Sequence, residues 1–129
     1  MSDIVVGVIG FGTVGKGVVK ILLNDREILE QRTGCRVELK RIVDLDTTTD
    51  RGITLPAGML TDDIAAILED SEINTVVEVI GGENPARSFI EKALEAGKNV
   101  VTSNKEVIAK HGKSFTDLAK KNNCTILYE

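Results

Sequence analysis

A chain of 129 residues is long enough for one domain with a buried core, and a content of 42% hydrophobic and 28% charged residues excludes disordered and fibrous proteins. Twenty acidic residues against 16 basic ones give a net charge of −4 without any basic block, so we expect no nucleic-acid partner. The longest apolar runs, of about six residues, are too short for a membrane span, and the sequence lacks a signal-like basic start, so we expect a cytoplasmic protein without membrane contact.

The first predicted unit is a strand, a glycine turn and a helix. An apolar strand at Ile4–Ile9 runs into the turn, and helical periodicity follows over 13–31. In such a unit Gly10 permits a tight turn, Gly12 lets the backbone approach a pyrophosphate, and Gly15 allows close packing of helix on strand. A plain glycine-rich turn is the alternative. We expect the whole turn to bind a dinucleotide, through Gly10, Phe11, Gly12, Thr13, Val14 and Gly15.

The second predicted strand, Val37–Val43, is followed directly by Asp44. This position lies at the carboxyl edge of the strand beside the glycine turn, so Asp44 is our candidate acceptor for a ribose 2′-hydroxyl. Its distance of 29 residues from Gly15 exceeds the usual spacing because the first helix is extended. A carboxylate there repels a 2′-phosphate and favours NAD over NADP, although Arg51 in the loop 47–58 could reverse that preference. An ordinary polar residue at a strand end is the alternative.

The central part of the chain predicts a very short strand at 58–60, a helix at 62–69 and a strand at 76–80. Glu78 interrupts this last strand, and a buried carboxylate needs partners, so we assign it a structural hydrogen-bonding role.

Gly81 and Gly82 follow that strand at the edge of the sheet where ligands bind in doubly wound folds. We expect the nicotinamide half of the cofactor to lie against their bare backbone, with a plain turn as the alternative.

The last third predicts a helix at 86–96, a strand at Asn99–Thr102, a helical region at 105–122 divided by Gly112, and a strand at 125–128. Because the sequence stops directly after an apolar strand, we expect it to be a truncated piece of a longer protein.

Lys105 places a cation at the positive end of a helix dipole, next to Ser103. Unfavourable local placements such as this one cluster at functional sites, so Ser103 and Lys105 are candidate cofactor contacts. The alternative is that Lys105 is a solvated surface lysine. His111, before Gly112, is assigned to a favourable helix-end contact. Two widely separated cysteines predict no disulfide.

Alternating strands and helices predict an α/β, Rossmann-type doubly wound fold, with a mostly parallel sheet of five or six strands and helices on both faces. We expect residues 1–129 to form one dinucleotide-binding domain that precedes a C-terminal substrate domain.

Five segments closely resemble parts of the cofactor-binding domain of homoserine dehydrogenase, and the resemblance covers nearly the whole chain. They are Gly-Phe-Gly-Thr-Val-Gly at 10–15, Val-Glu-Val-Ile-Gly-Gly at 77–82, Pro-Ala-Arg at 85–87, Gly-Lys-Asn-Val-Val-Thr-Ser-Asn-Lys at 97–105 and Ile-Ala-Lys-His-Gly at 108–112. Ser103 stands where the family commonly has alanine. The resemblance implies an NAD(P)-dependent oxidoreductase that interconverts L-homoserine and L-aspartate 4-semialdehyde, a step toward threonine and methionine.

The same resemblance implies that Lys105 lies beside nicotinamide and substrate and serves in cofactor binding and catalysis. Glu129 matches the start of a segment that helps bind a monovalent cation, and we expect the complete protein to be a homodimer. Two other classes stay open: the cofactor domain of an aspartate or aspartate-semialdehyde dehydrogenase, and a stand-alone nucleotide-sensing module.

Overall fold

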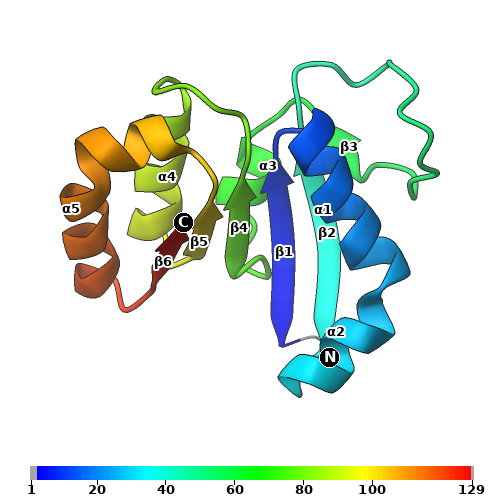
Figure 1. Cartoon of the computed structure of the whole chain (residues 1–129), viewed down its shortest axis with the longest axis horizontal. Helices are drawn as coiled ribbons and strands as arrows, with labels where there is room; N and C mark the ends of the chain where they lie inside the picture. Colours follow the sequence, from blue (N-terminus) through cyan, green and yellow to red (C-terminus); the bar gives the residue numbers. More distant parts are fainter. Residues whose placement is uncertain (1–2, 129) are drawn as a thin grey trace.

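The computed structural model describes residues 3–128, whose six strands form one parallel sheet in the order β3-β2-β1-β4-β5-β6 (Figure 1). The chain starts in the middle of the sheet at β1, builds outward to β3, and then crosses back to β4 on the other side. This reversal beside β1 confirms the doubly wound fold and creates the crevice in which such sheets bind ligands. The strands are β1 (Ile4–Ile9), β2 (Val37–Val43), β3 (Leu60–Thr61), β4 (Thr75–Glu78), β5 (Asn99–Thr102) and β6 (Ile126–Tyr128).

Helices cover both faces of the sheet, as predicted. They are α1 (Thr13–Asn24), α2 (Arg26–Thr33), α3 (Ala65–Leu68), α4 (Ala86–Glu95) and α5 (Lys105–Lys121). Figure 1 shows α1 and α2 beside β2, and α4 and α5 at the other end of the sheet near β5 and β6. Within residues 3–128, every helix is too short or too polar to cross a membrane.

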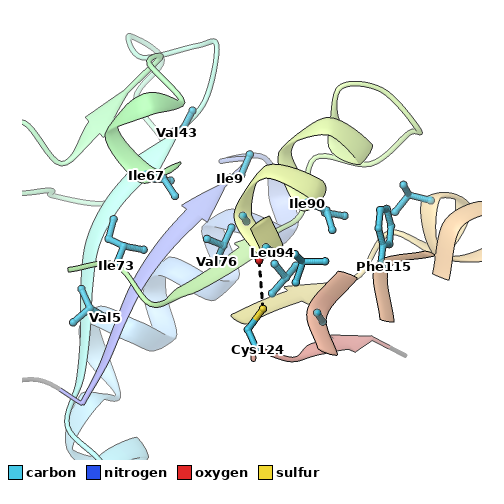
Figure 2. Close-up of a cluster of buried hydrophobic side chains, with 14 residues drawn as sticks. Val5, Ile9, Val43, Ile67, Ile73, Val76, Ile90, Leu94, Phe115 and Cys124 are labelled. Carbon is cyan, nitrogen blue, oxygen red and sulfur yellow. Dashed lines mark hydrogen bonds between the residues drawn. The ribbon is translucent and has the colours of Figure 1, made fainter. Parts of the chain in front are cut away.

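Two apolar cores lie on opposite faces of the sheet because successive side chains of a strand alternate. In β1, Val5 and Ile9 face one core and Val6 and Val8 face the other. The first core packs β1, β4 and β5 against α3, α4 and α5 and includes Phe115, which is 1% exposed (Figure 2). The second core packs β1 and β2 against α1. The sheet is therefore anchored from both sides around β1.

The thiols of Cys35 and Cys124 are both free. Cys124 is buried in the first core, where its Sγ donates to the carbonyl oxygen of Leu94 at 3.6 Å (Figure 2). Burial raises the pKa of the Cys124 thiol, so this side chain acts as a small apolar residue.

Two predicted helix boundaries were wrong. The single helix expected over 13–31 is broken at Asp25, which has non-helical φ and ψ of −109° and 22°. Asp25 is the C-cap of α1 and the N-cap of α2. The helical region expected to divide at Gly112 is continuous in α5. A glycine inside a helix costs about 1 kcal/mol, which is less than the gain from burying Val107 and Phe115 on the same helix.

Candidate cofactor site

The glycine turn between β1 and α1 has the geometry that the sequence predicts. Gly10 has φ of 108°, in the left-handed region that favours glycine, and a Cβ on Gly15 would lie 1.9 Å from the Gly10 carbonyl oxygen. A Cβ on Gly12, in contrast, would meet no protein atom within 4 Å. The fold therefore requires Gly10 and Gly15, whereas the absence of a side chain at Gly12 leaves room for a ligand.

The same Gly12 precedes α1 as its N-cap and supplies no side-chain oxygen to the N–H groups of the first turn. Backbone N–H groups at an open helix N-terminus bind anions, and they are helped by the helix dipole. Thr13 and Val14 form this first turn and are exposed. The start of α1 can therefore hold a diphosphate.

Asp44 lies at the carboxyl end of β2 and contacts the glycine turn directly. Its Oδ2 accepts a hydrogen bond from the Phe11 N–H at 2.6 Å, and its Oδ1 accepts one from the Asp46 N–H at 2.9 Å. The carboxylate thus braces the glycine turn, a role that the sequence does not indicate. Each oxygen retains a second lone pair for a ribose hydroxyl.

Arg51 reaches the same place from the loop after β2. Its Nη2 lies 3.6 Å from Asp44 Oδ1, its Nε donates to the Phe11 carbonyl oxygen at 2.7 Å, and its guanidinium lies 4.5 Å from the centre of the Phe11 ring. The Phe11 side chain is buried under this contact, and its backbone N–H already donates to Asp44, so Phe11 shapes the turn and has no free N–H for a ligand. Arg51 is the one basic residue between 47 and 58, which is the sequence signal that singles it out.

A cavity of about 390 Å³ opens at the carboxyl ends of β1, β2 and β4, on the face covered by α3 and α4. Its volume lies within the range of small-molecule sites. The walls are mainly apolar, with carboxylates at Asp44 and Asp62. We call it the Asp44 cavity; it is lined by Ile9, Val43, Asp44, Leu45, Asp62, Ile64, Ile80, Gly81, Asn84, Pro85 and Phe89.

A second cavity, of about 400 Å³, lies on the opposite face of the sheet, between α1 and the strands β4, β5 and β6. We call it the Lys105 cavity; it is lined by Val14, Val18, Val77, Val79, Val101, Thr102, Ser103, Lys105, Leu127 and Tyr128. Leu127 and Tyr128 are 62% and 48% exposed, so this apolar cavity is open to solvent.

The two cavities divide the predicted site residues. Ser103 and Lys105 line one cavity together with Val14, whereas Gly81 lines the other together with Asp44. The sequence alone does not indicate this division, since it predicts only that all these residues lie at the carboxyl edge of the sheet. Gly81 therefore shares a cavity with the expected ribose acceptor, Asp44, and not with Ser103 and Lys105.

Glu78 is fully buried and has the hydrogen-bonding role predicted for it. Its Oε1 accepts from the Thr102 hydroxyl at 2.7 Å, and its Oε2 accepts from the Ile80 N–H at 2.9 Å. Asn104, just before Lys105, caps α5 by accepting the Val107 N–H on its Oδ1 at 3.1 Å.

His111 does not lie at a helix end as predicted, because α5 continues to Lys121. Its Nε2 instead lies 3.1 Å from Glu83 Oε1, while Lys110 Nζ lies 3.0 Å from Glu83 Oε2. These two partners hold the pKa of the Glu83 carboxyl below its usual range. The turn that carries Gly82 is thereby tied to the middle of α5.

No group of three or more His, Cys, Asp or Glu side chains in the described part of the chain is arranged to hold a metal ion. Glu129, the predicted cation ligand, lies outside the described residues.

Comparison with known proteins gives a consistent result. The family model described as homoserine dehydrogenase, NAD binding domain, matches residues 10–129. Homoserine dehydrogenase of Bacillus subtilis is 37% identical over 129 residues, which are all of this chain and 30% of that protein.

Solved structures of similar proteins share the fold. Homoserine dehydrogenase of Staphylococcus aureus at pH 6.0 superimposes with a TM-score of 0.88 at 33% identity, over all of this chain and 33% of that one. The enzyme from Thiobacillus denitrificans gives a TM-score of 0.87 at 35% identity, over 98% of this chain and 29% of that one. The chain thus spans about a third of the length of the proteins it matches.

Proposed function

Because the chain belongs to the family of homoserine dehydrogenase NAD-binding domains, we propose that it holds the nicotinamide cofactor for hydride transfer between L-homoserine and L-aspartate 4-semialdehyde in a larger protein. Gly12 carries this proposal. Its missing side chain serves no packing purpose within the chain, yet it clears the space in front of an uncapped helix N-terminus. A diphosphate is the ligand group that such a geometry fits.

The rest of the cofactor follows from this anchor point. With the diphosphate on the first turn of α1, the adenosine half would extend into the Asp44 cavity, with its ribose on the Asp44 carboxylate. The nicotinamide half would extend the other way, toward Ser103 and Lys105. The bound nicotinamide ring supplies the hydride acceptor or donor, and the chain's own residues bind and orient it.

Titration calorimetry of the 129-residue chain with NADH tests this proposal. We expect a 1:1 complex, because the residues that would hold the adenosine and diphosphate groups all lie within this chain. ADP, which carries only those groups, should bind at the same site and compete with NADH. A chain that folds but binds neither ligand would overturn the proposed function.

The choice between NAD and NADP would depend on two side chains of opposite charge. The Asp44 carboxylate repels a 2′-phosphate, and the Arg51 guanidinium, 3.6 Å away, offsets part of that repulsion. We therefore propose a modest preference for NADH in the wild type. Equal or tighter binding of NADPH would contradict the role given to Asp44.

Single substitutions should change this preference in opposite directions. Asp44→Asn keeps an acceptor for the Phe11 N–H but removes the charge, so the affinity ratio should shift about five- to tenfold toward NADPH. Arg51→Gln removes the cation and should weaken NADPH about tenfold, and NADH less. Calorimetry of both variants with both coenzymes gives the ratio of NADH to NADPH affinity. If both variants shifted this ratio in the same direction, the opposing roles of Asp44 and Arg51 would be contradicted.

A further inference from the structure

Four polar or charged side chains are buried in the described part of the chain: Glu78, Lys98, Thr102 and Asn104. Lys98 lies just before β5, at the amino edge of the sheet, where its Nζ donates to the carbonyl oxygens of Asp70 and Ile73 at 2.6 Å each. The other three lie together at the carboxyl ends of β4 and β5, which are neighbouring strands (Figure 1). Thr102 lines the Lys105 cavity, whereas Glu78 and Asn104 line neither cavity.

Thr102 is the centre of this group. Its hydroxyl has a single proton, which it donates to Glu78 Oε1 at 2.7 Å, and its oxygen accepts the Asn104 N–H at 3.0 Å. Glu78 Oε2 then accepts the N–H of Ile80 at 2.9 Å. Each hydrogen bond in this series therefore has one defined donor and one defined acceptor.

Asn104 extends the network in two further directions. Its Oδ1 accepts the Val107 N–H and so starts α5, and its Nδ2 donates to the carbonyl oxygen of Gly82. Gly82 and its neighbour Gly81 have φ of 72° and 75°, in the left-handed region, so they form no regular strand or helix. The side-chain network supplies directional contacts that hold this turn.

The network joins the walls of the two cavities. Ile80 and Gly81, on one side, line the Asp44 cavity, while Ser103 and Lys105, on the other side, line the Lys105 cavity. Apolar side chains of the same size would be cheaper to bury than a carboxylate, an amide and a hydroxyl. Hydrogen bonds, however, fix distance and angle, which apolar packing does not.

We propose that Thr102, with Glu78 and Asn104, is a positioning residue that fixes the Asp44 and Lys105 cavities relative to each other, so that one dinucleotide engages both. The proposal rests on the proposed function, since it concerns a ligand that spans the two cavities. The two halves of such a ligand reinforce each other only when the separation of their sites matches the length of the ligand. A loosened network would therefore weaken the binding of the whole dinucleotide more than the binding of its adenosine half alone.

The test compares NADH with ADP on variants of the 129-residue chain, using calorimetry. Thr102→Val keeps the size of the side chain and removes both hydrogen bonds of the hydroxyl, whereas Thr102→Ser keeps the hydroxyl. We expect Thr102→Val to weaken NADH about tenfold while ADP binds within about twofold of the wild type. Thr102→Ser should restore most of the NADH affinity. Lys98→Met is the control, because it removes a buried polar group far from the cavities and should leave the ratio of the two affinities unchanged.

The outcomes separate the two proposals. If the wild type binds neither NADH nor ADP, the proposed function fails. If it binds both, but Thr102→Val weakens them equally or not at all, the positioning role is overturned. Because Thr102 itself lines the Lys105 cavity, Asn104→Asp, at a residue that lines neither cavity, is measured as well; it keeps the α5 cap and replaces the donor to Gly82 with an acceptor. An unchanged ratio for Asn104→Asp would then overturn the proposal.

Discussion

At the residue scale, the three glycines of the β1–α1 turn are required for different reasons. A Cβ at Gly15 would overlap the Gly10 carbonyl oxygen, and a Cβ at Gly10 would lie 2.8 Å from the Ile80 side chain, so both positions are fixed by the fold. Gly12 has φ of −84°, which any residue can adopt, and open space around its Cβ position. Substitution can therefore distinguish a requirement of the ligand from a requirement of the fold.

Gly12→Ala should fold normally and lose cofactor affinity. Alanine is a poorer N-cap than glycine but restricts the unfolded chain, so we expect stability to change by less than about 1 kcal/mol. Its methyl group would occupy the space assigned to the diphosphate and should weaken NADH at least about tenfold. Gly17→Ala is the matched control, because Gly17 is exposed within α1 and also has open space around its Cβ position.

That control should raise the stability by about 0.5–1 kcal/mol and leave NADH binding unchanged. Thermal denaturation and calorimetry on both variants give the two quantities. Normal NADH affinity in Gly12→Ala would mean that the diphosphate does not approach this backbone, and would contradict the proposed anchor point.

At the scale of the elements, the sequence predicts the strands better than the helix boundaries. The bounds of β1, β2 and β5 are as predicted, because short runs of β-branched residues covered on both faces leave little ambiguity. The break at Asp25, which is not predicted, and the continuous helix through Gly112, where a break is predicted, depend instead on how a helix packs against its neighbours. Local signals at those two positions therefore gave the wrong boundary.

The same distinction holds for the candidate site. Asp44, Ser103 and Lys105 reach the carboxyl edge because parallel strands end there together, which the sequence does predict. The pairing of Glu78 with Thr102 depends on the register between β4 and β5, in which these two residues stand opposite each other. Nothing in the spacing of the sequence fixes that register, so the hydroxyl partner of Glu78 could not be predicted.

The contact between α5 and the turn after β4 should make stability depend on acidic pH. Lys110 and His111 hold the pKa of Glu83 below its usual value of 4.5, so the folded chain releases this proton more readily than the unfolded chain. The stabilisation is thus fully present above about pH 4.5 and is lost as the pH falls through the lower, folded-state pKa.

The variant Glu83→Gln mimics the protonated carboxyl and isolates this effect. Its melting temperature should lie below that of the wild type at pH 7, and the difference should shrink as the pH falls below 4.5. Glu91→Gln, which removes one partner of an exposed ion pair within α4, is the control and should give a smaller difference at pH 7. A difference for Glu83→Gln that does not change with pH would mean that charge at Glu83 contributes nothing.

At the scale of the whole molecule, the Lys105 cavity is more open to solvent than the Asp44 cavity. Its far wall is the face of β5 and β6, where the side chains of Val101, Leu127 and Tyr128 are 37%, 62% and 48% exposed. A small alcohol aligned for hydride transfer needs contacts on several sides, since orientation supplies a large part of the rate enhancement. Substrate specificity in the complete protein would therefore depend on groups beyond those that line this cavity.

Lys105 would be the main contribution of this domain to that chemistry. Its ammonium has no hydrogen-bond or ion-pair partner within residues 3–128, and it lies near the start of α5, where the helix dipole disfavours a cation. An uncompensated cation at this place would suit the substrate oxygen, the nicotinamide ribose or a cofactor phosphate. In the complete protein, Lys105→Ala should lower kcat/KM at least about 100-fold, the scale of losing one electrostatic or proton-transferring group.

Stability and kinetics together identify which of these contacts Lys105 makes. Removing a cation from a helix N-terminus should leave the melting temperature unchanged or slightly raised, so a clear loss of stability would make Lys105 a structural residue. A lower kcat with unchanged cofactor affinity would place Lys105 at the reacting atoms, whereas a change confined to the cofactor KM would place it on the cofactor. Lys113→Ala, which removes an exposed lysine farther along α5, should leave both parameters unchanged. If Lys105→Ala, like the control, had the kcat and KM of the wild type, Lys105 would be an ordinary surface lysine. This domain would then contribute cofactor binding alone.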